Sequence, residues 1–167
     1  MSILDKTSRH YAGLALSMCA AATAVAAAPS DGELRLAPKE IAALAKISAG
    51  AGTSGVAGIQ TTVLAGDPSA PGPYTIALRV PANTIIAAHT HRDDRSAVVV
   101  SGTWWFGYGP VNATDKLKAL APGSFYTEPG GQAHFARTGK QPAVVYITGV
   151  GPTDTHYVDA SADPRGH

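Results

Sequence analysis

The chain has 167 residues, 45% of them hydrophobic, which is enough for one domain with a buried core. The net charge is +1 and no long basic or acidic run occurs, which argues against nucleic acid or an anionic membrane surface as the main partner. The 18 glycines and 12 prolines favour short strands joined by turns over a helical bundle.

Residues 1–26 have the pattern of an export signal. Lys6 and Arg9 give a weakly basic start, an uncharged run rich in Ala and Leu follows, and Ala24-Val25-Ala26 suits signal cleavage. A membrane anchor is the alternative, but the run is short and only mildly apolar. We therefore expect an exported protein, periplasmic or secreted, with no membrane contact after signal removal. The single cysteine, Cys19, lies in this segment, which leaves the mature domain without a disulfide or a catalytic thiol.

Residues 27–58 are predicted to form a lead-in and a loop. Pro38 suits the first turn of a short helix. Ile41, Leu44 and Ala45 follow at helical spacing, so this helix would dock on a sheet. Residues 48–58, rich in Gly, Ser and Ala, predict a loop.

From residue 59 to residue 155 the sequence changes to short β-type segments separated by turn residues. Evenly spaced short strands of this kind predict an all-β antiparallel sandwich or barrel. Residues 156–167 are predicted to form a polar C-terminal tail. The predicted strands are 59–64, 74–80, 84–91, 97–101, 103–108, 116–120, 124–127, 131–137 and 143–150.

Three histidines in this region have the pattern of a metal site. His89 and His91 lie two apart on one predicted strand, so their side chains project from the same face. Two imidazoles on one face form a chelate for a divalent metal, and His134, after the turn at Pro129, supplies a third ligand. His156 and His167 in the tail are not expected to be ligands.

Residues 60–155 resemble the cupin superfamily. Its first signature contains a glycine, a His-x-His pair, a glutamate and a second glycine; its second contains Gly, Pro-x-Gly, His and Asn. The segments 64–68 and 101–107 also look like those of small, exported single-domain cupins. The resemblance implies a double-stranded β-helix, or jelly-roll barrel, with a metal bound by three histidines and a carboxylate. His89, His91, Gly102, Gly123, Pro129, Gly131 and His134 match the signatures, whereas Asn83, Arg95 and Thr138 replace the opening Gly, the Glu and the Asn.

Arg95 is the departure that matters, because a guanidinium stays charged and has no lone pair for a metal. Three arrangements remain open. The three histidines could bind Zn, Fe, Mn or Ni alone, with open positions for water and substrate. Asp93 or Asp94 could supply the carboxylate, with Arg95 paired to the other. The third arrangement has no metal, and Arg95 and the histidines bind an anion instead.

Three further polar residues, together with Arg95, complete the candidate site. Glu128 precedes the Pro129 turn and could act as a general base or a substitute ligand. Tyr126 is the second catalytic candidate. Arg95 and Tyr146 are the candidates for substrate binding.

The resemblance implies a metal-dependent enzyme, oxygenase-like or isomerase-like, that acts on a small organic molecule. The alternative is a non-catalytic binding or sensing protein, in which Arg95 replaces the glutamate and takes a small molecule or anion. Fold alone does not choose between these functions. A homodimer is expected from the family, and the aromatic segment 104–108 would favour self-association if it were exposed.

Overall fold

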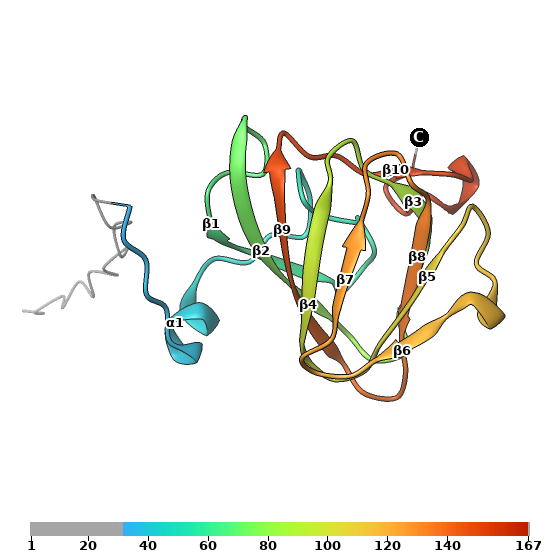
Figure 1. Ribbon diagram of the computed structural model, residues 1–167, viewed down its shortest axis with the longest axis horizontal. Coiled ribbons are helices and arrows are strands. Elements are labelled where there is room, and N and C mark those ends of the chain that lie inside the picture. The colour runs from blue at the N-terminus through green and yellow to red at the C-terminus, as the bar shows by residue number, and fades with distance from the viewer. Residues whose placement is uncertain (1–31, 167) are drawn as a thin grey trace, which may run out of the picture. The chain divides into compact units, whose positions relative to one another are not determined.

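The computed structural model describes residues 32–166. The predicted export signal, including Cys19, lies outside the described residues. The chain divides into the units Met1–Glu33 and Leu34–His167, and the second of them contains every helix and strand described below (Figure 1). Within residues 32–166, no helix has the length and apolar character needed to cross a membrane.

The lead-in contains one short helix, α1, at Pro38–Ala43. Proline suits this first turn because its missing N–H would have no partner there. The Glu40 carboxylate accepts a hydrogen bond from the Ala37 N–H at 2.6 Å. Ile41 is the buried residue of the helix, whereas Ala45 is exposed and lies beyond its end. The predicted short N-terminal helix is therefore confirmed.

Two five-stranded antiparallel sheets form the barrel, and the predicted all-β jelly roll is confirmed. The first sheet has the order β1 (Gln60–Ala65), β2 (Gly72–Val80), β9 (Ala143–Gly151), β4 (Arg95–Ser101) and β7 (Phe125–Glu128). The second has the order β10 (His156–Tyr157), β3 (Ile85–Thr90), β8 (His134–Thr138), β5 (Trp104–Tyr108) and β6 (Lys118–Leu120). Short 3-10 helices lie at Thr114–Lys116 and Ala160–Ala162.

The core lies between the sheets and follows the two-residue period of the strands. Along β9, Val145 and Ile147 are buried while Tyr146 between them is only half-buried. Trp104 and Phe106 enter the same core from the second sheet. Each fully buried side chain of this size contributes about 1.5–3 kcal/mol to folding. Trp104 and Phe106 thus belong to the core, whereas Trp105 is half-buried and Tyr108 is 41% exposed, and a dimer surface on this strand stays a prediction.

Asn83 shows how the chain tolerates a departure from the cupin signature. Its φ of 56° lies in the left-handed region, where glycine is favoured and asparagine is the commonest substitute. Its N–H donates to the Gly139 carbonyl at 2.7 Å, which ties the turn before β3 to the turn after β8. The two strands that carry the histidines are therefore fixed together at this turn.

Candidate metal centre

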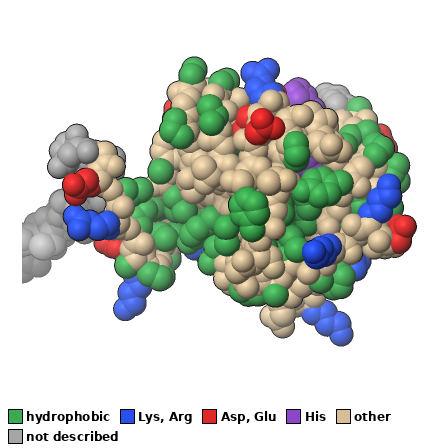
Figure 2. All heavy atoms as spheres, in the orientation of Figure 1, with side chains coloured by type: hydrophobic (Ala, Val, Ile, Leu, Met, Phe, Trp, Pro, Cys, Tyr) green, Lys and Arg blue, Asp and Glu red, His purple; other side chains and the backbone are tan. Residues whose placement is uncertain are grey.

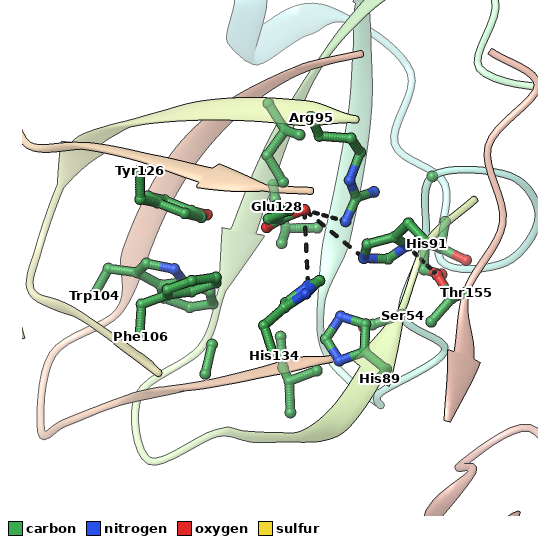
Figure 3. Close-up of a pocket in the computed structure, with 16 residues that line it drawn as sticks. Ser54, His89, His91, Arg95, Trp104, Phe106, Tyr126, Glu128, His134 and Thr155 are labelled. Carbon is green, nitrogen blue, oxygen red and sulfur yellow. Dashed lines mark hydrogen bonds and ion pairs between the residues drawn. The ribbon is translucent and has the colours of Figure 1, made fainter. Parts of the chain in front are cut away.

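The three histidines converge at one end of the barrel. His89 on β3 and His134 on β8 are direct partners across the antiparallel register, and His91 follows the end of β3. All three are buried: His89 is 6% exposed, His91 4% and His134 1%. Their potential ligand nitrogens lie within 4.8 Å of one another, and Figure 3 shows the rings grouped around a common space.

A β-bulge in β3 brings His89 into this group. The register with β8 shifts between Ile86 and His89. Ile86 and Ala88 are buried in the first part of the strand, whereas His89 and His91 are the buried residues that follow. The inward face thus changes from even to odd positions, because a bulge inserts an extra residue and redirects the strand.

Backbone carbonyls fix the orientation of each imidazole. A carbonyl only accepts, so each Nδ1 must carry the proton, and Nε2 is left with its lone pair. The Nε2 atoms of His91 and His134 are buried and have no hydrogen-bond partner. Metal-binding histidines show this arrangement, with one nitrogen held by the protein and the other directed at the ion. The Nδ1 contacts are His89 to Ala87 O at 2.7 Å, His91 to Asp154 O, and His134 to Gln132 O at 3.0 Å.

Burial keeps the three rings neutral. Desolvation, helped by the neighbouring His134, lowers the pKa of His89 to about 3. Desolvation also lowers the pKa of His91, with Arg95 as the second cause, and lowers the pKa of His134. At neutral pH all three are therefore in the form that donates a lone pair to a metal.

A carboxylate from β7 borders the three histidines. Glu128 pairs with Arg95 in the register between β4 and β7, and both side chains are buried. The Arg95 Nη2 forms an ion pair with Glu128 Oε2, which lies 3.8 Å from the Nε2 of both His91 and His134. Dashed lines in Figure 3 mark these three contacts. Burial raises the pKa of Glu128, but the Arg95 guanidinium and the neighbouring His134 and His89 together outweigh it and hold this pKa below its usual value, so the group is ionised.

No protein-family model matches the sequence, and no curated protein does either. Solved structures do match. The polyketide cyclase RemF from Streptomyces resistomycificus aligns with a TM-score of 0.62 and 18% identity over 79% of this chain and 89% of that chain. A cupin 2 conserved barrel domain protein from Rhodopseudomonas palustris aligns with a TM-score of 0.51 and 13% identity, over 62% and 69%. The chain has the cupin fold.

A structure described as "DMSP lyases RdDddP and RnDddQII" also aligns, at 23% identity and a TM-score of 0.48. The alignment covers 56% of this chain and 47% of that chain, so this chain spans about half of its length. The two neighbours with TM-scores above 0.5 establish the fold alone, so the site has to be argued from the residues of this chain.

The two aspartates considered as replacement ligands lie outside the histidine cluster. Asp94 is exposed, and its Oδ1 accepts from the Gly130 N–H at 2.8 Å. Asp93 is buried, but Tyr74 Oη donates to one of its oxygens at 2.7 Å and Thr153 Oγ1 donates to the other at 2.6 Å. Among residues 32–166, the three histidines are the only group of three or more potential ligands.

The two tyrosines lie on opposite faces of the first sheet. Tyr126 is buried and lines the cavity, its ring centroid 4.3 Å from that of Phe106, and its hydroxyl has no hydrogen-bond partner. Burial raises the pKa of Tyr126 well above its usual value, so the hydroxyl stays protonated. Tyr146 projects from the outer face of β9, opposite Val98 of β4, and the structure does not bring it to the cavity.

The cavity between the histidines and Tyr126 is small, and it is partly closed by residues of the predicted N-terminal loop and by the last residue of the predicted barrel. Its volume is about 30 Å³, close to the space of one water molecule. Gly52, Thr53 and Ser54 from the predicted N-terminal loop line it, together with Thr155 near the C-terminus. Sequence reasoning missed these four residues, because no sequence pattern indicates where a loop crosses a barrel.

Proposed function

We propose that this cupin is a metal-dependent enzyme whose ion is held by His89, His91 and His134. The observation that carries the proposal is the pair of buried Nε2 atoms, on His91 and His134, that face one cavity without a partner. Leaving a buried acceptor unpaired costs about 1–3 kcal/mol, and a ligand at this point removes that cost. A bound divalent ion supplies Lewis acidity, or water activated at neutral pH.

The donor set fits such an ion. Imidazole and carboxylate suit Zn, Fe, Mn and Ni. Donor atoms around a metal with bonds of about 2.1 Å lie roughly 3–3.5 Å apart. The 3.8 Å distances from Glu128 Oε2 to the Nε2 atoms of His91 and His134 therefore need only a small contraction.

Two residues of the chain would act on the substrate. Glu128 is ionised and borders the histidines, so it would serve as the fourth ligand or accept a proton from the substrate. Tyr126 has a protonated hydroxyl without a partner at the cavity wall, so it would donate a hydrogen bond to a substrate oxygen. Arg95 would position Glu128 and keep it charged.

The ion pair weakens the alternative of an anion-binding protein. That function requires a free cation, but the Arg95 guanidinium is already neutralised by Glu128. A small organic substrate for an oxygenase-like or isomerase-like reaction is therefore the better proposal. Uptake of O2 by the iron form would separate the two reaction types, since an isomerase consumes none.

Metal analysis of protein purified without a metal-binding tag tests the proposal. We expect close to one divalent ion per chain in the wild type. His134→Ala should lower the metal affinity by more than about 100-fold. This loss is larger than the one expected for a residue that only hydrogen-bonds to a metal ligand. His156→Ala is the matched control, because His156 is exposed and pairs only with Asp154. The proposal would be contradicted if the wild type bound no metal after reconstitution, or if His134→Ala bound metal with unchanged affinity.

We further propose export and self-association. Export follows from the pattern of residues 1–26, and the mass of the mature chain in a periplasmic or secreted fraction would test it. Self-association follows from an apolar outer surface on β4 and β7, where Val98, Val100 and Phe125 are 41%, 41% and 64% exposed. Figure 2 shows hydrophobic side chains on the face that carries these strands. Sedimentation of wild type and Phe125→Ser would test the homodimer.

A further inference from the structure

The metal-site cavity cannot admit an organic substrate in its present form. Its volume of about 30 Å³ accommodates one water molecule, whereas pockets for small organic ligands measure about 300–1,000 Å³. Any enzymatic reaction at the histidines therefore requires part of the cavity wall to move.

A larger cleft lies directly outside that wall. Its volume is about 610 Å³, which suits a small organic molecule. Thr53 and Thr155 line both the inner cavity and this outer cleft. These two residues therefore separate the histidines from the cleft, and Figure 3 shows Thr155 and the neighbouring Ser54 beside His91 and His89.

One side of this wall is a short glycine-flanked segment, Gly50–Gly55. Gly50, Gly52 and Gly55 have φ values of 102°, 78° and 76°, in a region that glycine adopts without strain. Side chains of the C-terminal region hold the segment through two hydrogen bonds, from Thr155 Oγ1 to Thr53 O at 3.1 Å and from Tyr157 Oη to Ser54 O at 2.7 Å. A third hydrogen bond, from Thr61 Oγ1 of β1 to Gly52 O at 3.5 Å, holds it from the first sheet. Opening therefore breaks three hydrogen bonds to the segment, each of which contributes little net stability.

We propose that the outer cleft is the substrate-binding site and that Gly50–Gly55 is the gate through which substrate reaches the histidines. This inference rests on the proposed function. Ser48, Thr53, Asp154, His156 and Arg165 line the cleft. Arg165 is already paired with Asp163, and His156 with Asp154, so the described residues of the cleft include no free cation for an anion. It suits a small uncharged molecule that carries hydroxyl groups, with one oxygen group entering the cavity once the gate opens.

A disulfide across the gate would test the proposal. A Cβ atom placed on Gly55 would lie 2.6 Å from Arg165 Cγ, so Gly55→Cys with Arg165→Cys brings two thiols into bonding range. The full chain would also carry Cys19→Ser, to prevent other pairings. The bond would hold the segment against the C-terminal region without placing sulfur in the cavity, because neither residue lines the cavity.

The readout is labelling of the cavity histidines by diethyl pyrocarbonate, which is a small organic electrophile that reacts with neutral imidazole. Metal-free protein is labelled and each histidine is quantified by peptide mass spectrometry. His156 is the internal reference, because its side chain is 71% exposed. We expect labelling of His89, His91 and His134 at least about tenfold slower in the oxidised than in the reduced protein, with His156 unchanged. Equal labelling of the cavity histidines in both forms would overturn the proposal.

A single substitution tests the gate in the opposite direction and does not depend on the cysteine pair. Tyr157→Phe removes the hydroxyl that holds Ser54, so labelling of the cavity histidines should rise about fivefold, within the range that one hydrogen bond provides. Tyr146→Phe, on the outer face of β9, is the matched control and should leave labelling unchanged. Unchanged labelling in Tyr157→Phe would contradict the gate.

These measurements separate the two proposals. Labelling needs no metal, so it reports on the gate whether or not the histidines bind an ion. If the site takes up no metal, the proposed function is wrong. If the labelling rate of the cavity histidines is the same with and without the disulfide, only the gate is wrong.

Discussion

The two ends of the barrel interior differ sharply although the same strands form both. The inward residues of β4, in order from the site end, are Arg95, Ala97 and Val99. On β7, Glu128 lies opposite Arg95 and Tyr126 lies opposite Ala97. At one end the inward side chains are ionisable and at the other they are apolar. The site end is therefore a local replacement of core residues on the same strands, accompanied by the bulge in β3.

The energetics of the two ends also differ. The apolar end gains stability from area removed from water, and any well-fitting hydrophobic residue would serve there. The polar end buries two charges and three imidazoles, which are stable only when each is paired or hydrogen-bonded. Stability at the site end thus depends on specific partners, whereas at the core end it depends on volume.

The largest effect should come from breaking the ion pair. Glu128→Gln leaves the Arg95 guanidinium buried without its counter-charge, and we expect a loss of about 3–5 kcal/mol in the free energy of unfolding. Urea denaturation of the metal-free protein measures it. Asp94→Asn is the control, because Asp94 is exposed, and should change stability by less than about 0.5 kcal/mol. If Glu128→Gln left the free energy of unfolding unchanged, the ion pair would not stabilise the site end.

A double substitution tests whether the cost belongs to the lone charge. Arg95→Met combined with Glu128→Leu replaces both partners by apolar groups, and it should be about as stable as the wild type or more so. In this variant the two buried charges at the site end are replaced by apolar side chains, as in the core. Retention of the large loss in the double variant would mean that packing, rather than charge, explains the single substitution.

A smaller effect is expected at the core end. Val145 has 0% exposure, and Val145→Ala removes two methyl groups, for a loss of about 2 kcal/mol. Metal content should stay at the wild-type level, because Val145 does not line the cavity. Val144→Ala, at a half-buried neighbour, is the control and should cost less. Loss of metal in Val145→Ala would show that the two ends are coupled.

The sequence predicted the barrel well because its signals are local. Each of the nine predicted strands overlaps one of β1 to β9, since alternation and turn residues are properties of short segments. Only β10 was missed, as its two residues become a strand by pairing with β3. The convergence of the three histidines was also predicted, from a two-residue period and a family signature.

The remaining parts of the site depend on contacts between distant segments. Glu128 was a candidate, but its pairing with Arg95 follows from the register of β4 and β7, which no local pattern gives. Asp93 was considered as a replacement ligand, whereas it is buried and bonded to Tyr74 and Thr153, far away in the sequence. The position of the 48–58 loop over the cavity is likewise set by tertiary contacts.

The smallest effect is expected when the ion pair is reversed. In the family signature the carboxylate stands at position 95, and here it stands directly across the ladder at Glu128. Arg95→Glu combined with Glu128→Arg exchanges the two charges between neighbouring strands at the same level of the barrel.

We expect the reversed protein to keep close to one metal per chain, because the carboxylate still borders the histidines. Its stability should fall by about 1 kcal/mol, since the new carboxylate at position 95 approaches the buried Asp93, which now helps to stabilise the Arg95 charge. Adding Asp93→Asn should recover part of that loss. Metal analysis and urea denaturation measure both quantities. If the reversed protein bound no metal, the strand that supplies the carboxylate would matter as much as its charge, and this chain would have a ligand geometry distinct from that of the cupin signature.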